Sequence, residues 1–415
     1  MPHARRIFKE SRLLSWNFAE HLTICSNMIG LYLSTSRFGN TTRKLEAIGH
    51  AKKLSQEIGD PYLCVLVASR ESSVLRMNDE TQKSTEVIQD AMGKFVNPDR
   101  TLSSPLVDPR FNAQIGRLIQ SRAENLIFTD NIEEAQRELS AWNPIDNASP
   151  SSIEQAVQVS IDLTLGRLLK IQGHFETALS QLAPMFERVE TEDIGTGGWR
   201  RVLLANIGEL YCELGRPADA RSILIPELDY MKLTKSHNVS SGLRIQLVVA
   251  ESYLREGSHE CSREVAGTVR RVLERSKEHS SISRRFNLRA WTILARIAHM
   301  REDWDEALEC WRESLKILDL MHNSSGPNAA IVKFSIAHTL QKQGCINESA
   351  EQAALARKNL ELEKTRRYHF TGFDSYWRDT IVTDFLYWTD PFVNSPRIAQ
   401  STDDIEVSSR HARKV

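Results

Sequence analysis

The sequence has no long apolar stretch, no paired cysteines and almost no excess of charge of either sign. No segment approaches the roughly 18 consecutive apolar residues that a membrane helix needs, which argues against a membrane-spanning protein. The 53 Lys and Arg residues balance 54 Asp and Glu residues, which argues against a nucleic-acid binder that is basic overall. With 26% charged and 41% hydrophobic residues, the chain has the composition of a folded protein and not of a disordered one.

Motifs for catalysis and metal binding are also missing. The six cysteines stand singly with no Cys-x-x-Cys pair, so neither a zinc site nor a redox motif is indicated. There is no His-Glu-x-x-His, no Gly-x-Ser-x-Gly and no strand followed by Gly-x-Gly-x-x-Gly. We therefore predict no catalytic residue, no cofactor and no metal, and we expect a protein that is not an enzyme.

The first residues, MPHARRIFKESRLLSW, lack the apolar core of a secretory signal. We therefore expect an intracellular protein, located in the cytoplasm or alternatively in the nucleus.

Apolar residues recur at three- and four-residue steps between short polar breaks. Within Leu203 to Leu214 they are Leu203, Leu204, Ile207, Leu210, Tyr211 and Leu214. This spacing is typical of α-helices, and the alternation typical of β-strands is nowhere sustained. The breaks collect glycine and proline, at 97–109, 142–152, 191–198, 235–242, 277–283 and 322–327. We predict an all-α fold.

A small residue recurs at a regular spacing along the chain. It lies at 123, 166, 208, 250, 295 and 337, with spacings of 43, 42, 42, 45 and 42 residues. Ser72 and Gly30 continue the series upstream, so we count up to eight repeats of two helices. Two antiparallel helices pack closely only where one presents a small residue to a bulky side chain of the other. The recurring position is therefore predicted to be a helix-packing contact.

The clearest copy, LLANIGELYCELGRPADARSIL at 203–224, resembles the tetratricopeptide signature. Another copy contains Trp291, Leu294, Ala295, Trp304, Ala307 and Trp311. The period near 42 exceeds the usual value of about 34 and is similar to that of kinesin light chains and of sensor arrays in nucleotide-binding signalling proteins. This resemblance implies a right-handed α-solenoid whose first helices line a concave groove. Unlike those sensor proteins, the chain has no Gly-x4-Gly-Lys-Ser/Thr loop.

The domain boundaries follow from the extent of the repeats. We expect an N-terminal segment at 1–19, the repeat array at 20–362, aromatic-rich capping helices at 363–393 and a disordered polar tail at 394–415. The aromatic-rich stretch carries rings from Tyr368 to Trp388, which are suited to closing the exposed end of the last repeat. The alternative is an exposed aromatic surface that binds a partner.

The resemblance also predicts which side chains face the groove. These slots lie one, four and five residues after the small residue and three and six before it. Among the charged residues in these slots the basic ones outnumber the acidic ones, nine to four: Arg76, Arg117, Arg167, Lys170, Arg244, Arg255, Arg289, Arg296 and Lys342. His299 and His338 lie on the same predicted surface, and the acidic residues there are Glu124, Glu209, Glu213 and Glu251. We expect a basic groove that binds another protein through an acidic or C-terminal peptide segment. The alternative is that the arginines are ordinary surface residues paired with the glutamates.

Three functional hypotheses remain at this point. The first is a non-enzymatic scaffold or adaptor that binds a partner segment in the groove. The second is a regulatory or accessory subunit of a larger assembly or biosynthetic pathway, and the third, least favoured, is an all-α enzyme. Nucleic acid is not the expected partner, because the paired arginines lack the aromatic interleaving of single-strand binders.

Overall fold

The computed structural model describes residues 18–35, 41–78, 80–94, 108–128, 131–171, 174–191, 197–256, 262–278, 284–320 and 327–366. Regular structure in these residues consists of sixteen α-helices, α2 to α17, and no strand. The predicted all-α fold is therefore confirmed. Across these same ranges, no helix combines the length and apolar character that a membrane crossing requires.

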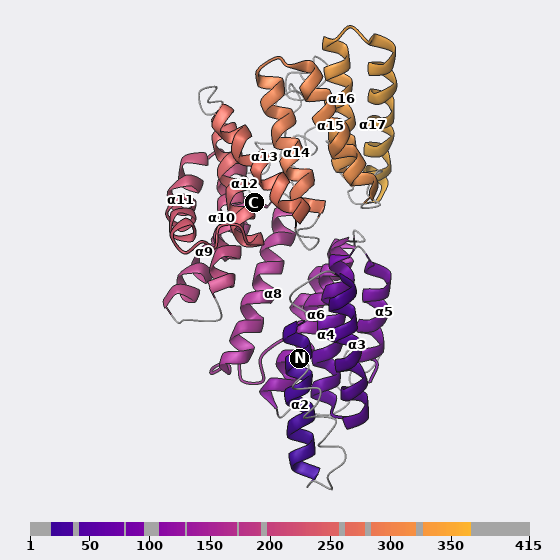
Figure 1. Ribbon diagram of the computed structural model, residues 1–415, viewed down its shortest axis with the longest axis vertical. Helices are drawn as coiled ribbons and strands as arrows, with labels where there is room; N and C mark the ends of the chain where they lie inside the picture. Colours follow the sequence, from indigo (N-terminus) through magenta and orange to yellow (C-terminus); the bar gives the residue numbers. More distant parts are fainter. Residues whose placement is uncertain are drawn as a thin grey trace, which may run out of the picture. The chain divides into compact units, whose positions relative to one another are not determined.

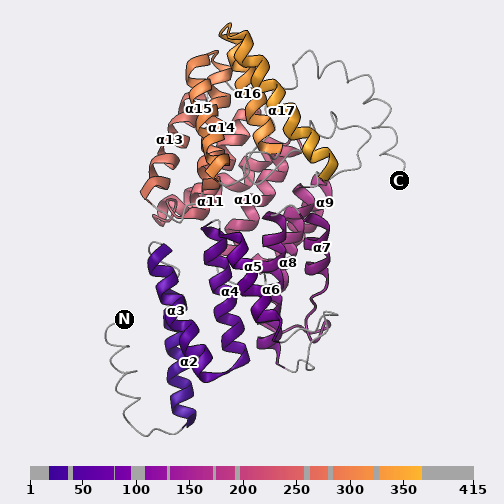
Figure 2. The ribbon, with the colours of Figure 1, turned by 90° about the vertical axis from the view of Figure 1, so that its right-hand side faces the viewer.

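The chain divides into two compact units, residues 1–165 and 166–415. Unit 1 contains three antiparallel helix pairs, and Figure 2 shows α4, α5 and α6 side by side. The pairs are α2 (Phe18–Thr35) with α3 (Thr41–Ile58), α4 (Pro61–Met77) with α5 (Thr81–Met92), and α6 (Pro109–Phe128) with α7 (Ile132–Ser140). The unit boundary falls inside α8 (Ser152–Ile171).

Unit 2 continues the same pattern of helix pairs (Figure 1). The end of α8 packs on α9 (Phe175–Thr191), where Leu182 approaches Gly166. The following pairs are α10 (Gly197–Glu213) with α11 (Pro217–Leu233), α12 (Ser240–Arg255) with α13 (Ser262–Glu278), α14 (Arg284–Met300) with α15 (Trp304–Leu320), and α16 (Pro327–Lys342) with α17 (Ile346–Arg366).

The even-numbered helices are the first helices of eight repeats. Each contains one of the eight predicted small residues, from Gly30 in α2 to Ala337 in α16, so the predicted repeat frame is confirmed. First helices of successive repeats also contact one another, as α4 does α6 in unit 1 and as α12 does both α10 and α14 in unit 2. Side chains from neighbouring repeats therefore meet on the surface that the first helices share.

Steric packing explains the glycines of this frame. A Cβ atom added to Gly208 would lie 2.5 Å from Leu224 Cδ1, and one added to Gly166 would lie 2.6 Å from Leu182 Cδ2. Carbon atoms in contact prefer separations of about 3.5–4.0 Å, so only glycine allows these helices to approach so closely. Gly116, which the repeat frame does not single out, is similar, since a Cβ there would meet the indole of Trp142 at 2.7 Å.

The prediction of close packing at Gly30 is wrong. Gly30 is exposed, and a Cβ built on it would meet no atom within 4 Å. The reason is that α2 turns Met28, Ile29 and Tyr32 toward α3 instead, where they join a buried cluster with Ile48.

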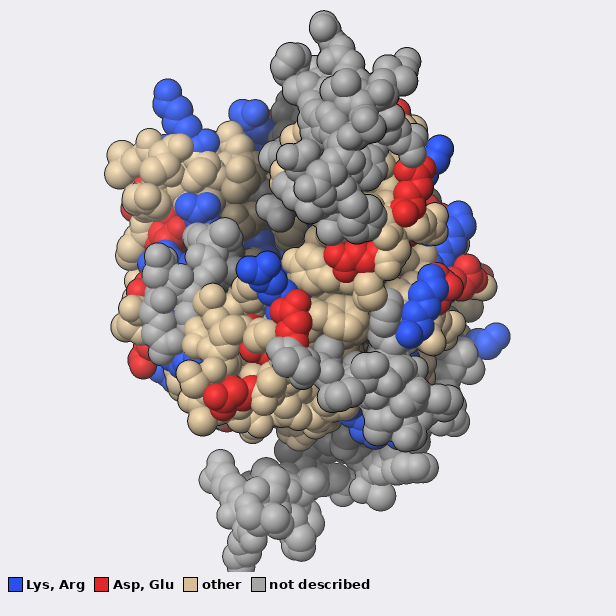
Figure 3. Space-filling view, turned by 90° about the horizontal axis from the view of Figure 1, so that it is seen from below, with Lys and Arg blue, Asp and Glu red and all other residues tan. Residues whose placement is uncertain are grey.

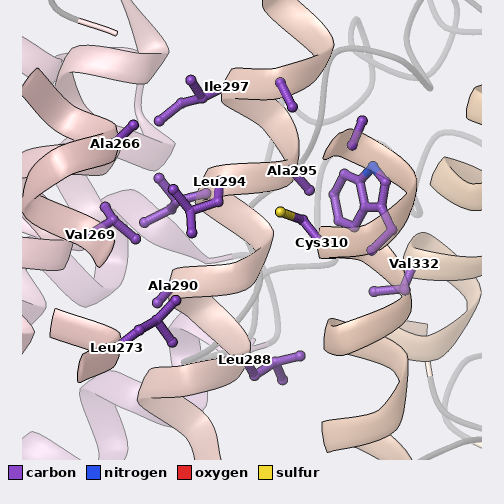
Figure 4. Close-up of a cluster of buried hydrophobic side chains, with 14 of the residues drawn as sticks. Ala266, Val269, Leu273, Leu288, Ala290, Leu294, Ala295, Ile297, Cys310 and Val332 are labelled. Atoms are coloured by element: carbon purple, nitrogen blue, oxygen red, sulfur yellow. The ribbon is translucent and has the colours of Figure 1, made fainter. Parts of the chain in front are cut away.

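The largest described core of unit 2 is built from residues of α12 to α16, and Figure 4 shows part of it. Leu294 of α14 points toward Val269 of α13, while Ala295 faces Cys310 of α15. Trp311 of α15 is completely buried in the same cluster. One apolar cluster therefore joins three successive repeats of unit 2.

The described helices extend close to the predicted array boundaries. The first begins at Phe18, and α17 ends at Arg366, four residues past the predicted end of the array at 362. Residues 1–17 and 367–415 lie outside the described residues, so the aromatic capping helices and the polar tail stay predictions.

Candidate binding surface on the first helices of unit 2

Glu209 is the centre of a cluster of charged side chains on the first helices of unit 2. Its Oε2 accepts hydrogen bonds from Lys170 Nζ at 2.7 Å and Arg244 Nη2 at 2.9 Å. Its Oε1 accepts from Arg289 Nη1 at 2.6 Å and Arg244 Nε at 3.1 Å. These three cations come from α8, α14 and α12, whereas Glu209 lies on α10. One carboxylate therefore joins four first helices.

Burial and charge act in opposite directions on Glu209. The residue is only 1% exposed, and burial alone raises the pKa of its carboxyl group. Arg244, Lys170 and Arg289 outweigh this effect and hold the pKa well below its usual range. Glu209 is therefore ionised over the whole physiological pH range.

A second set of ion pairs surrounds Glu251 of α12. Arg296 Nη1 donates to both oxygens of Glu251, at 2.8 and 2.7 Å, and Arg255 Nε donates to Oε1 at 2.7 Å. Arg255 also donates from Nη2 to Glu213 at 3.0 Å. Burial favours the neutral form of Glu251, but Arg296 and Arg255 lower its pKa. At Glu213 burial dominates over Arg255, and the pKa is raised.

We call these residues together the charge network. Its members are Lys170, Glu209, Glu213, Arg244, Glu251, Arg255, Arg289 and Arg296. The side chains differ in burial, since those of Lys170 and Arg289 are 2% exposed, while those of Arg244 and Arg255 are 18% and 19% exposed. The charge network thus extends from the interior of unit 2 to its surface. Arg244 and Arg255 are the members whose side chains are most exposed to solvent.

The structure brings together five of the basic residues predicted to face the groove, namely Lys170, Arg244, Arg255, Arg289 and Arg296. They pair with three of the four acidic residues predicted there. In unit 1, Arg76 pairs with the fourth, Glu124, and donates to Asn125 Oδ1 at 3.4 Å. Pairing with the glutamates, which the sequence left as the alternative, is thus observed for these cations.

The remaining predicted basic residues are Arg117, Arg167 and Lys342. Arg117 on α6 donates to Gln114 of the same helix at 3.4 Å. Arg167 on α8 is half-buried, and Lys342 on α16 is exposed with its Nζ 6.0 Å from the ring centre of Trp304. Charges of both signs are interspersed on the molecular face drawn in Figure 3.

His299 and His338 belong to a separate aromatic cluster. Trp311 Nε1 donates to His299 Nε2 at 3.0 Å, and Thr339 Oγ1 lies 2.7 Å from the same nitrogen. Because an indole N–H can only donate, Nε2 accepts and the imidazole is neutral with its proton on Nδ1. Burial, followed by the neighbouring His338, lowers the pKa of His299 to about 3. This cluster joins α14, α15 and α16 rather than offering a charged ligand site.

Comparison with solved structures identifies the fold. The sequence itself matches no family model and no curated protein. A Rap protein complexed with Competence and Sporulation Factor aligns with 83% of this chain and 87% of its own, at 13% identity and a TM-score of 0.52. The chain has the tetratricopeptide repeat fold.

Two further structures of this class are more distant. The apo form of the quorum sensor NprR from B. thuringiensis aligns with 74% of this chain and 84% of its own, at 13% identity and a TM-score of 0.46. A putative kinesin light chain of Podospora anserina with TPR-like repeats aligns with 52% of this chain and 99% of its own, at 19% identity and a TM-score of 0.36.

The tetratricopeptide frame did not predict the polar side chains that support the charged ones. Asn206, two residues before Gly208, is buried and accepts from Arg244 Nη2 at 3.1 Å. In unit 1, Asn125 donates to Ser84 Oγ at 2.9 Å and so connects α5 with α6. The signal in the sequence was an asparagine at a helix position where the repeat pattern expects a buried apolar residue.

The described residues hold no group of three or more His, Cys, Asp or Glu side chains placed to bind a metal ion.

Proposed function

We propose that this chain is a non-enzymatic scaffold or adaptor that binds another protein on the first-helix surface of unit 2. The bound element is an acidic segment or a C-terminal carboxylate, and the protein acts in the cytoplasm or alternatively in the nucleus. The observation that carries this proposal is the charge network, in which Arg244 and Arg255 reach the surface from a pre-arranged set of ion pairs. Guanidinium groups bind carboxylates through paired, charge-assisted hydrogen bonds.

The fold supports a binding role for this surface. Successive first helices place their side chains next to one another, so a chain segment that crosses them meets several repeats at once. The Rap protein of similar fold was solved in complex with Competence and Sporulation Factor. We extend a binding role of that kind to the present chain as a proposal.

A second candidate function is that of an accessory subunit in a larger assembly. It is favoured by two exposed apolar side chains on the second helix α11, Tyr230 and Leu233, which are 56% and 83% exposed. They are three residues apart and therefore lie on one face of the helix. Two neighbouring apolar side chains on one helix face could add apolar area to a contact with another protein.

Selection from a displayed library of random 16-residue peptides tests the main proposal. We expect peptides enriched on the full chain to be acidic, and their affinity to fall as NaCl is raised from 50 to 500 mM because salt screens the interaction. The double variant Arg244→Gln/Arg255→Gln should lose these peptides. Enrichment of peptides without acidic residues, or no enrichment, would contradict the proposal.

Arg221→Gln is the matched control for this experiment. Arg221 is an arginine of similar exposure that pairs with Glu256, but it lies on the second helix α11 outside the charge network. Its substitution should leave peptide binding unchanged. The variant Leu233→Asp separates the second candidate, since it should affect assembly through α11 and not peptide binding.

A further inference from the structure

We infer that Glu213 is the proton switch of the charge network. Uptake of one proton by its carboxyl group removes a negative charge from the network and weakens its bond to Arg255, so the first-helix surface of unit 2 becomes more positive as the pH falls. This inference rests on the proposed function and adds its regulation, because a more positive surface attracts an acidic segment more strongly.

The three carboxylates of the charge network differ in the number of cations that contact them. Glu209 accepts hydrogen bonds from three cations, and Glu251 accepts them from two. Among the described residues, one cation contacts Glu213, namely Arg255 with its Nη2 at 3.0 Å. Partners of this kind stabilise the charged form of a buried carboxylate. Glu213 is therefore the least compensated of the three.

The cation at Glu213 is shared with a second carboxylate. Arg255 donates from Nε to Glu251 at 2.7 Å and from Nη2 to Glu213, so both carboxylates depend on one guanidinium group. Glu251 also has Arg296 as a partner, and its negative charge disfavours the charged form of Glu213. When one of these two carboxyl groups becomes neutral, the proton therefore goes to Glu213.

Burial favours the neutral form of the same group. The side chain of Glu213 is 4% exposed, and this burial is the largest influence that raises the pKa of its carboxyl group. On its own helix, Glu209 lies one turn earlier and Cys212 is its neighbour. The charged groups that face it from other helices are Arg255 and Glu251 of α12, Lys170 of α8 and Arg296 of α14. The balance of these groups leaves its pKa raised, whereas those of Glu209 and Glu251 are lowered.

The other two helices that pack on α10, which are α9 and α11, carry charged side chains with partners of their own. The ion pairs there include Asp219 with Arg216, Glu227 with Arg201 and Glu190 with Arg200. None of these pairs involves Glu213, so α8, α12 and α14 supply the charges that act on it most.

One proton changes the charge of the network substantially. The network has five cations against three carboxylates, so its net charge is +2 when all are ionised and +3 when Glu213 is neutral. Arg255 then keeps Glu251 as its charged partner. Its hydrogen bond to Glu213 loses the charge on the acceptor and becomes about half as strong.

NMR of the full chain, labelled with carbon-13 at the glutamate carboxyl carbons, tests the switch without any ligand. The Glu213→Gln variant assigns the Glu213 signal, because it lacks that signal. From pH 8 to 4.5 we expect the Glu213 signal to titrate above about 4.3, the value of a free glutamate, and before those of Glu209 and Glu251. The Nε–Hε resonance of Arg255 should shift with the same midpoint, and in Glu213→Gln it should not shift.

Glu227→Gln is the matched control for the titration. Glu227 is a buried glutamate of unit 2 whose side chain is 5% exposed, but it lies on α11 outside the charge network and has two cations, Arg200 and Arg201. Its substitution should leave the midpoints of Glu213 and Arg255 unchanged.

Peptide binding tests the regulatory effect. The probe is hexaglutamate in 50 mM NaCl, with hexaglutamine as the control peptide. At pH 7.5 Glu213→Gln, which imitates the neutral form, should bind hexaglutamate about two- to fivefold more tightly than the original chain, the effect of one partly exposed charge. The difference should disappear as the pH is lowered through the midpoint that NMR gives for Glu213.

Two results would overturn the inference. One is a Glu213 signal that titrates together with or below those of Glu209 and Glu251, or an Arg255 resonance that does not follow it. The other is equal affinity of Glu213→Gln and the original chain for hexaglutamate at pH 7.5. If neither chain binds hexaglutamate, the result counts against the proposed function, and the titration without ligand decides by itself whether Glu213 is the switch.

Discussion

Arg289 on α14 donates a hydrogen bond of 2.6 Å to Glu209 on α10, although a complete repeat separates their helices in the chain. Both side chains are almost fully buried. Helix α12 lies between the two, since it contacts both α10 and α14. The ion pair therefore crosses α12 and joins three consecutive repeats. In repeat proteins stability comes mainly from contacts between neighbours, so a link across a repeat should increase the cooperativity of unfolding.

Replacement of Arg289 tests this role. Arg289→Met removes one of three cations from Glu209 and should lower the free energy of unfolding by about 1.5–3 kcal/mol, the range for a hydrogen bond to a charged group. The denaturant dependence should also become less steep or acquire a second phase, because the central repeats would unfold less cooperatively. Urea unfolding followed by circular dichroism measures both, and an unchanged midpoint and slope would contradict the expectation.

Two glycines of unit 2 should respond in opposite directions to the same substitution. Gly208→Ala places a methyl group against Leu224 and should cost about 1–2 kcal/mol through overpacking. Gly267→Ala, in α13, meets no atom within 4 Å and should stabilise the protein by about 0.5–1 kcal/mol, because alanine favours the helix. Thermal unfolding of both variants checks the pair, and a stabilising Gly208→Ala would show that the close helix contact is absent.

Mild acid should destabilise unit 2 through His299. The pKa of this imidazole is about 3 in the folded protein and about 6.5 when unfolded, so the unfolded state binds more protons between these values. Stability is therefore fully present above pH 6.5 and falls as the pH drops toward 3. The loss from this residue is at most about 1.4 kcal/mol per pH unit.

The variant His299→Gln identifies the residue responsible. It should reduce the slope of the unfolding free energy against pH between pH 6.5 and 5, because the unfolded chain then has one imidazole fewer to protonate. Its stability at pH 7.5 is the reference, because loss of packing shifts the whole curve without changing the slope. Equal slopes for the variant and the original chain would exclude this role of His299.

The cysteines should differ strongly in reactivity. Burial, followed by the charge of Glu306, raises the pKa of the Cys310 thiol to about 12, and burial with Glu251 raises the pKa of Cys212 well above its usual range. Cys345, between α16 and α17, is exposed. Since the thiolate is the reactive form, iodoacetamide at pH 8 should label Cys345 long before Cys212 and Cys310. Peptide mapping by mass spectrometry checks the order, and early labelling of Cys212 would contradict the described burial.

The sequence predicted the repeat frame because the frame depends on local steric needs. Gly166 and Gly208 recur at the spacing of the helix pairs, and each meets a leucine of its own second helix. The same frame placed Glu209 and Glu251 one residue after the small position, and both are buried where they pair with cations of neighbouring first helices.

The sequence left pairing of the arginines with the glutamates as an alternative, but it could not say which charged residues pair. Arg289 and Glu209 are 80 residues apart, and their contact depends on the length of both side chains and on how closely α10, α12 and α14 approach. Lys170 is buried whereas Arg244 is partly exposed, and this difference depends on helix packing that the residue pattern does not show. At Gly30 the sequence predicted a contact that is absent. The residue has the expected small size, but no side chain packs against it.

A double-mutant cycle tests the central claim most directly, namely that Arg244 binds a carboxylate of the partner segment. The cycle combines Arg244→Gln with replacement of each acidic residue by its amide in a library-selected peptide, and isothermal titration calorimetry measures the four affinities. We predict a coupling free energy of about 1–3 kcal/mol for one acidic residue, as for residues in direct contact. Additive effects at every acidic position, within about 0.3 kcal/mol, would contradict the account.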